Sequence, residues 1–167
     1  MINKINKLSE KSFCDVFGNV FENSRWISRD LYAQKPFINF DDLSSKMLNI
    51  FEKTSKENKL KVLNSHPDLA DKAKIGSLTV ESNKEQSDSG LDKCTKKEFD
   101  EFKSLNIQYK KKFGFPFIIA VKGKSKIKIL NDFKERITYD INKEVTEAAQ
   151  QVKKIATLRI NEILKND

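Results

Sequence analysis

Four groups of residues in this sequence carry side chains or backbone groups that could do chemistry at neutral pH. The first is His66, the only histidine among 167 residues, which precedes Pro67 in the sequence NSHPDLA. Proline disfavours the helical conformation in the residue before it, so this pair predicts the exit from a helix. General acid or base catalysis favours a group that titrates near neutral pH on a rigid backbone. A lone histidine is often a surface or core residue, but the position of His66 favours catalysis.

The second group is the polar run from Ser82 to Gln86, which contains Ser82, Asn83, Lys84, Glu85 and Gln86. The spacing of Ser82 and Glu85 fits a capping box, in which the serine caps a helix and the glutamate bonds back to it. That structural interpretation needs no further function. A helix N-terminus also presents free backbone N–H groups that suit a carboxylate or carbonyl oxygen, so both interpretations can hold together.

The third candidate is Arg159, which lies in a C-terminal segment with helical periodicity. Arg159 comes four residues after Ile155 and four before Ile163, and so falls within the apolar stripe of this helix. An arginine in that place must be paired or must reach a polar cavity. The sequence leaves a buried salt bridge and a ligand contact about equally open.

The fourth candidate is the apolar run FGFPFIIAV, which contains Phe117, Ile118, Ile119, Ala120 and Val121. Its length and lack of polar residues predict an extended or irregular buried segment rather than a surface helix. Core packing alone would explain the apolar content. Backbone N–H and C=O groups outside a helix still need partners, however, and a planar ligand rich in amides could supply some of them.

These candidates must be positioned by helices, because apolar residues recur at helical spacing along most of the chain. Serine 9 caps the first predicted helix, and Thr95 and Glu98 form a capping box at a later one. Residues 67 to 94 have weak periodicity and are mainly a connection. The sequence therefore predicts an all-α, single-domain bundle of about seven or more helices over residues 1–167. The predicted helices cover residues 9–21, 25–33, 41–53, 55–65, 95–113, 125–139 and 142–164.

Composition narrows the class of protein further. The formal net charge of +8 is almost all lysine, spread along the chain and interleaved with Asp and Glu, and only four arginines are present. A solvated surface is therefore favoured over a nucleic-acid footprint, which usually concentrates basic residues on one face. No stretch is long enough to span a membrane, and no signal or anchor sequence is evident, so the cytoplasm is expected. Cys14 and Cys94 lack the spacing of a metal or disulfide motif.

Taken together, four motifs resemble the 2-oxo-4-hydroxy-4-carboxy-5-ureidoimidazoline (OHCU) decarboxylase family. They occur in the order of that family and cover most of the chain, and their combination is specific although no single motif is. One departure is Ser89, where alanine is common. The motifs are HPDLA (66–70), SxxEQxxSGL (82–91), LNxxYxxKFGFPFIIAVKG (105–123) and EVTEAAQQVKKIATLRINEIL (144–164).

The resemblance implies an all-helical homodimer that uses no metal or organic cofactor and forms (S)-allantoin from a small-molecule substrate. It assigns catalysis to His66 with Glu85 beside it. The substrate contacts that it implies are Pro67, Ser82, Asn83, Lys84, Glu85, Gln86, the backbone of Phe117, Ile118, Ile119, Ala120 and Val121, and Arg159.

Two other functions stay open at this level. A basic helical module that binds nucleic acid would explain the charge but not the His-Pro junction or the arginine in the apolar stripe, and a salt titration would identify it. The second alternative is a degenerate homologue that serves only as a protein-interaction partner. The retention of all the motif residues together argues against it.

Overall fold

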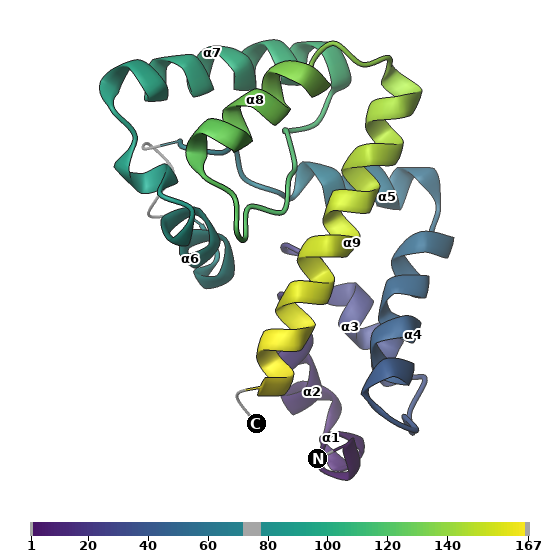
Figure 1. The fold of residues 1–167 in the computed structure, drawn as a ribbon. Helices are drawn as coiled ribbons and strands as arrows, with labels where there is room; N and C mark the ends of the chain where they lie inside the picture. The colour runs from purple at the N-terminus through teal and green to yellow at the C-terminus, as the bar shows by residue number, and fades with distance from the viewer. Residues whose placement is uncertain (1, 72–77, 166–167) are drawn as a thin grey trace. The chain divides into compact units, whose positions relative to one another are not determined.

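The computed structural model describes residues 2–71 and 78–165, and within these ranges all regular structure is helical, without a β-strand (Figure 1). The predicted all-α fold is therefore confirmed. The elements are α1 (Ile2–Lys7), α2 (Glu10–Phe17), α3 (Arg25–Tyr32), α4 (Phe40–Lys53), α5 (Lys56–Asn64), α6 (Val80–Asp88), the 3₁₀ helix η2 (Leu91–Lys93), α7 (Lys96–Phe113), α8 (Lys126–Arg136) and α9 (Ile141–Lys165).

Most helix starts agree with the signals in the sequence. The side chain of Ser9 caps α2, and Thr95 and Glu98 form the predicted capping box at α7. The first predicted helix is shorter than expected, because α2 ends at Phe17 and turns follow as far as Asn23. Helix α1 has no counterpart in the prediction. No described helix is both long and apolar enough to cross a membrane.

The start of α6 corrects one sequence prediction. Ser82 does not cap this helix, because the hydroxyl of Thr79 accepts the backbone N–H of Ser82 at 3.2 Å. The helix begins at Val80, and Ser82 lies in its first turn. The predicted capping box of Ser82 and Glu85 is therefore wrong, and the N–H of Ser82 is already bound within the protein. A threonine three residues upstream offers the same capping chemistry.

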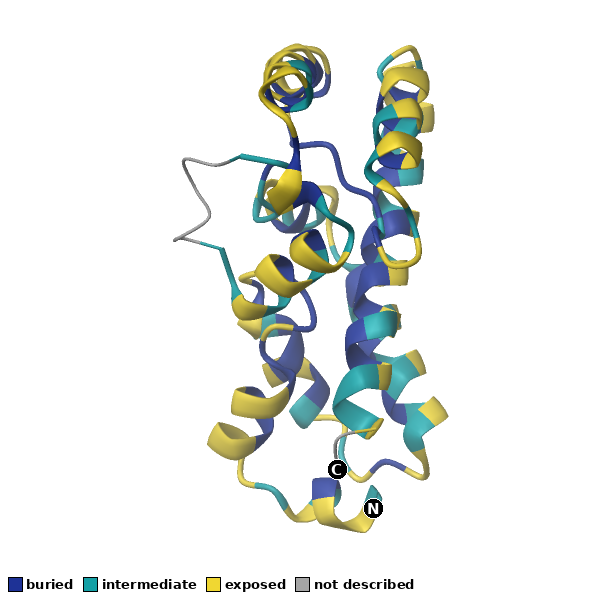
Figure 2. Ribbon diagram, turned by 60° about the vertical axis from the view of Figure 1, so that its left-hand side comes forward, coloured by how far each residue is buried: buried dark blue, intermediate teal, exposed yellow. Residues whose placement is uncertain are grey.

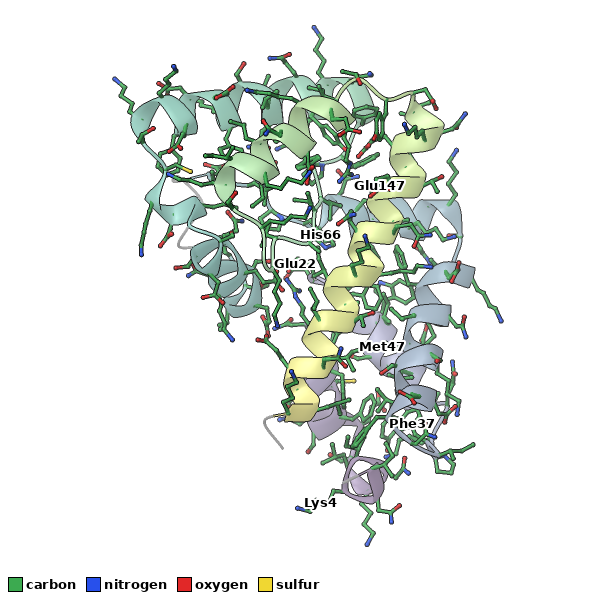
Figure 3. The ribbon with its side chains drawn as sticks, in the orientation of Figure 1. Lys4, Glu22, Phe37, Met47, His66 and Glu147 are labelled. Atoms are coloured by element: carbon green, nitrogen blue, oxygen red, sulfur yellow. The ribbon has the colours of Figure 1, made fainter. Side chains whose placement is uncertain are left out.

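The described chain divides into two compact units. The first comprises residues 2–65 with 153–165, and its helices pack through a phenylalanine-rich core. The rings of Phe13 and Phe17 lie 4.7 Å apart, and those of Phe21 and Phe51 lie 5.2 Å apart. Met47, labelled in Figure 3, is buried beside this core on α4. The single domain over 1–167 stays a prediction.

The second unit comprises residues 66–71 and 78–152 of the described chain. Its core surrounds Tyr109 on α7, which is completely buried and meets Phe115, Phe117 and Phe133 edge-on. Phe117 and Phe133 stack with their ring centroids 3.9 Å apart. Most helices carry buried residues on one side and exposed residues on the other, as the amphipathic pattern predicts (Figure 2).

Candidate active site

His66 lies where the sequence places it, immediately after a helix. Helix α5 ends at Asn64, Ser65 is its C-cap, and the N–H of Ser65 bonds to the carbonyl of Lys61 at 3.0 Å. His66, labelled in Figure 3, and Pro67 follow, and both residues are half-buried. The predicted exit from a helix is thus confirmed, and His66 belongs to the second unit.

The segment that follows His66 is attached to α6 by Gln86. The side-chain oxygen of Gln86 accepts the N–H of Ala70 at 3.0 Å, and its Nε2 donates to the carbonyl of Asp68 at 3.3 Å. Gln86 is 8% exposed. The structure therefore brings one predicted substrate residue of α6 against the backbone of the predicted catalytic segment.

The other predicted residues of α6 differ in burial. Ser82, one turn before Gln86, is buried, and Glu85 is half-buried. Asn83 and Lys84 are exposed, because they fall on the other side of the helix. Ser82 and Gln86 thus share the buried side of α6, whereas the predicted partnership of Glu85 with His66 stays a prediction.

Residues 114–121 form the buried irregular segment that the sequence predicts. Helix α7 ends at Phe113, and Gly114 turns the chain with a φ of 80°, in the left-handed region that glycine tolerates. Residues 115–119 are all buried and outside any helix. The backbone of this segment must therefore find partners other than a helix ladder.

Two backbone groups of the segment are bound by side chains from α8 and α9. The carbonyl of Ile118 accepts a hydrogen bond from Arg136 Nη1 at 2.7 Å, and the N–H of Ala120 donates to Gln151 Oε1 at 3.0 Å. Within residues 2–71 and 78–165, neither the N–H nor the C=O of Ile119 has a hydrogen-bond partner. Ile119 therefore offers one donor and one acceptor to a ligand with amide groups.

Behind this segment lies a buried polar network that the sequence analysis missed. Arg136 Nε lies 3.1 Å from both carboxylate oxygens of Glu144, and the guanidinium stands 4.5 Å from the centre of the Phe117 ring. The hydroxyl of Tyr109 donates to the same carboxylate. Burial, together with this hydrogen bond to Glu144, raises the pKa of Tyr109 well above its ordinary value, so the phenol stays neutral.

Helical spacing could have revealed that network. Arg136 follows Ile129 by seven residues and Phe133 by three, so it lies on the buried side of α8. Glu144 precedes the buried Ala148 by four residues on α9. Arg136 and Glu144 therefore share with Arg159 a place on the buried side of a helix, which their spacing in the sequence indicates.

Arg159 is buried in the first unit, as its place in the apolar stripe predicts. It is 4% exposed, and its Nη1 lies 2.9 Å from Glu22 Oε2 and 2.9 Å from the carbonyl oxygen of Asn19. Glu22 is 1% exposed. Of the two interpretations left open by the sequence, the structure contains the buried salt bridge, and the contact of Arg159 with substrate stays a prediction.

A cleft of about 220 Å³ lies beside α8 and α9 in the second unit, and Ile119 is one of the residues that line it. Its polar side chains pair with one another: Lys124 bonds to Asp132, and Tyr139 bonds to Glu135, each at 2.8 Å. Glu147, labelled in Figure 3, accepts from Gln151. Because these side chains pair with one another, the side-chain pairs by themselves give no indication of a ligand.

The sequence profile described as OHCU decarboxylase matches residues 6–161. This chain belongs to the OHCU decarboxylase family. It is 35% identical to the 2-oxo-4-hydroxy-4-carboxy-5-ureidoimidazoline decarboxylase of Halalkalicoccus jeotgali, over 97% of this chain and 90% of that protein. It is also 35% identical to the enzyme of the same name from Xenopus laevis, over 99% of this chain and 95% of the relative.

Longer relatives and solved structures agree with this membership. The chain is 38% identical to the uric acid degradation bifunctional protein of Bacillus sp. (strain TB-90), over 98% of this chain but only 32% of that protein. A crystal structure of (S)-allantoin synthase superposes with a TM-score of 0.79 at 26% identity, covering 98% of this chain and 53% of the other. A structure of OHCU decarboxylase in the presence of (S)-allantoin, at 19% identity and a TM-score of 0.71, covers 95% and 99% and shows the shared fold.

Proposed function

We propose that this chain decarboxylates 2-oxo-4-hydroxy-4-carboxy-5-ureidoimidazoline to (S)-allantoin in the breakdown of urate. The observation that carries the proposal is the family match, which extends over residues 6–161 and is shared with decarboxylases of nearly the same length. The position of His66 after α5 fits this chemistry, as do the backbone groups of Ile119, which have no hydrogen-bond partner among residues 2–71 and 78–165.

The substrate supplies its own place for the electrons of the broken bond. Its carboxylate is attached to a ring carbon that also bears a hydroxyl and stands next to a C=N bond. As carbon dioxide leaves, the C–C bonding pair moves toward the ring, the C=N pair moves onto nitrogen, and that nitrogen takes up a proton. The enol that results then loses its hydroxyl proton while the neighbouring ring carbon gains one. The net reaction consumes one proton and releases carbon dioxide.

The protein then has to orient the carboxylate, exclude water and move protons on one face of the ring. In this proposal His66 exchanges the proton of the substrate hydroxyl, and Glu85 orients the imidazole. Gln86 and the other residues of the run Ser82–Gln86, together with Pro67, contact the ring and ureido groups. The backbone of residues 117–121, including the N–H and C=O groups of Ile119, binds the planar amide groups of the substrate.

The decisive experiment supplies freshly generated OHCU to the purified protein and follows the circular dichroism of the allantoin formed. We expect accumulation of the S enantiomer, faster than the uncatalysed reaction. In solution the enol is planar and can be protonated on either face, so uncatalysed decarboxylation gives no optical activity. Formation of optically inactive allantoin at the uncatalysed rate would refute the proposal.

Activity is expected to survive exhaustive treatment with EDTA and to need no pyridoxal phosphate, thiamine diphosphate or nicotinamide. The reason is that the substrate's own C=N bond accepts the electrons for which other decarboxylases bring a cofactor. The measurement is the initial rate before and after chelation and dialysis. Loss of activity that a divalent metal restores would contradict this mechanism.

The proposal includes a homodimer that works in the cytoplasm on a small molecule, without nucleic acid or membrane partners. The charge distribution supports a small-molecule substrate over a nucleic-acid partner. Lysines on α2, α4, α5 and α8 lie within salt-bridge distance of carboxylates, as expected for a solvated surface of mixed charge. Binding to DNA with a steep dependence on salt would favour the nucleic-acid alternative instead.

A further inference from the structure

The segment that follows His66 is held by side chains from two different helices. Besides the two bonds from Gln86 on α6, Asn106 on α7 donates from Nδ2 to the carbonyl of Leu69 at 3.0 Å. Asp68, Leu69 and Ala70 therefore each have a backbone group bound to a side-chain amide. Asn106 is 6% exposed, so its amide has little access to water.

A second attachment comes from the same side of α7. Lys110, one turn after Asn106, places its Nζ 2.6 Å from Oδ2 of Asp68. The carboxylate of Asp68 is 9% exposed, whereas Lys110 is 42% exposed. Helix α7 thus contacts the segment through both a backbone carbonyl and a side chain.

The backbone of this segment adopts a conformation that needs such support. Ala70 has a φ of 53°, in the left-handed region that residues with a Cβ rarely occupy. Strained backbone of this kind persists only where its surroundings fix it, and it is concentrated at functional sites. Here the bond from the N–H of Ala70 to Gln86 and the bond from Asn106 to the carbonyl of Leu69 supply that support.

We propose that Asn106 is a positioning residue for His66, acting through the carbonyl of Leu69. Pro67 limits rotation between His66 and the attached segment, so a shift of residues 68–70 moves the imidazole. Catalytic groups must be held within about 0.5 Å of their productive geometry. This role rests on the proposed function, since it gives Asn106 a part in the reaction without contact with the substrate.

The test compares Asn106→Leu with Asn6→Leu. Leucine has the same number and branching of side-chain heavy atoms but cannot donate to Leu69. Asn6 is a matched control, because it also binds a loop backbone through its amide, with Nδ2 2.8 Å from the carbonyl of Phe37, but in the first unit. We expect kcat to fall about 10- to 100-fold in Asn106→Leu, since a displacement of about 1 Å costs on that order. KM should change less than about threefold, and Asn6→Leu should keep wild-type kcat.

A second readout needs no substrate. Because His66 is the only histidine of the chain, its imidazole signals in a ¹H–¹⁵N NMR spectrum need no assignment. We expect these signals to shift, broaden or split in Asn106→Leu and to stay unchanged in Asn6→Leu. Lys110→Met, which breaks the contact with Asp68 from a more exposed position, should change them in the same way if Asn106→Leu does not fold.

The two readouts separate this inference from the proposed function. Unchanged imidazole signals in folded Asn106→Leu would overturn the positioning role, and so would unchanged signals in Lys110→Met if Asn106→Leu does not fold. If the imidazole signals change in Asn106→Leu but the wild-type protein does not turn over OHCU, the proposed function is refuted and the positioning of His66 is still supported. A loss of kcat equal in Asn106→Leu and Asn6→Leu would also overturn the inference, because it would reflect lost stability alone.

Discussion

Replacement of His66 by alanine or asparagine is expected to lower the rate of OHCU decarboxylation by about 10²- to 10⁴-fold, the usual contribution of a general acid or base. The fold should persist, because His66 is half-buried and follows the C-cap of α5 rather than belonging to the apolar side of a helix. The measurements are steady-state kinetics and a thermal melt on each variant. We expect melting temperatures within a few degrees of wild type, since substitutions outside the core usually cost little.

The matched control is Asn64→Ala, two residues earlier in the chain. Asn64 is exposed at the end of α5, and its side chain bonds to the carbonyl of Leu60 on the same helix, at 3.0 Å. Wild-type turnover is expected for this variant. If His66→Asn kept more than about a tenth of the wild-type rate, His66 would not be the general acid or base.

The parts of the fold that the sequence predicts are those determined by near neighbours in the chain. Helical periodicity identifies α2 to α5 and α7 to α9, and the serine, threonine and proline signals locate several of their ends. The exit of the chain at His66 is predictable for the same reason, because proline acts on the residue next to it. Where two capping signals stand three residues apart, as Thr79 and Ser82 do, the choice between them depends on packing.

The partners of the site residues are beyond such local signals. Periodicity places Arg159 on a buried stripe, but its partner Glu22 lies 137 residues away in the sequence. Likewise the amide of Asn106 meets Leu69 across 37 residues. Periodicity reports which face of a helix is buried, whereas tertiary packing decides which groups meet there. The contacts that fix the loop after His66 therefore emerge only from the structure.

Truncation of Arg159 to alanine is expected to lower the free energy of unfolding by about 3 to 5 kcal/mol, the typical cost of breaking a buried salt bridge. The cost arises because Glu22, 1% exposed, would lose the guanidinium 2.9 Å from its carboxylate. Arg159→Lys keeps the charge but loses the planar fork, so an intermediate loss is expected. Equilibrium unfolding of both variants in denaturant measures these changes in the free energy of unfolding.

The control for this prediction is the double variant Arg159→Met with Glu22→Leu. Replacing both members of a buried pair by apolar residues removes the unpaired charge, so the double variant should be more stable than Arg159→Ala. A variant Arg159→Ala that unfolds like wild type would show that the buried pair contributes nothing to stability.

Kinetics on Arg159→Lys then test the contact with substrate that the family resemblance implies. A substrate analogue stabilises any native state that it binds, so it should raise the melting temperature of wild type. If Arg159 contacts the ligand, the analogue should raise the melting temperature of Arg159→Lys by less than it raises that of wild type. The kcat/KM of Arg159→Lys should then be lower than that of wild type even at temperatures where the variant is folded. If Arg159 serves only the pair with Glu22, both proteins should gain the same stabilisation, and kcat/KM should stay near wild type at temperatures where Arg159→Lys is folded.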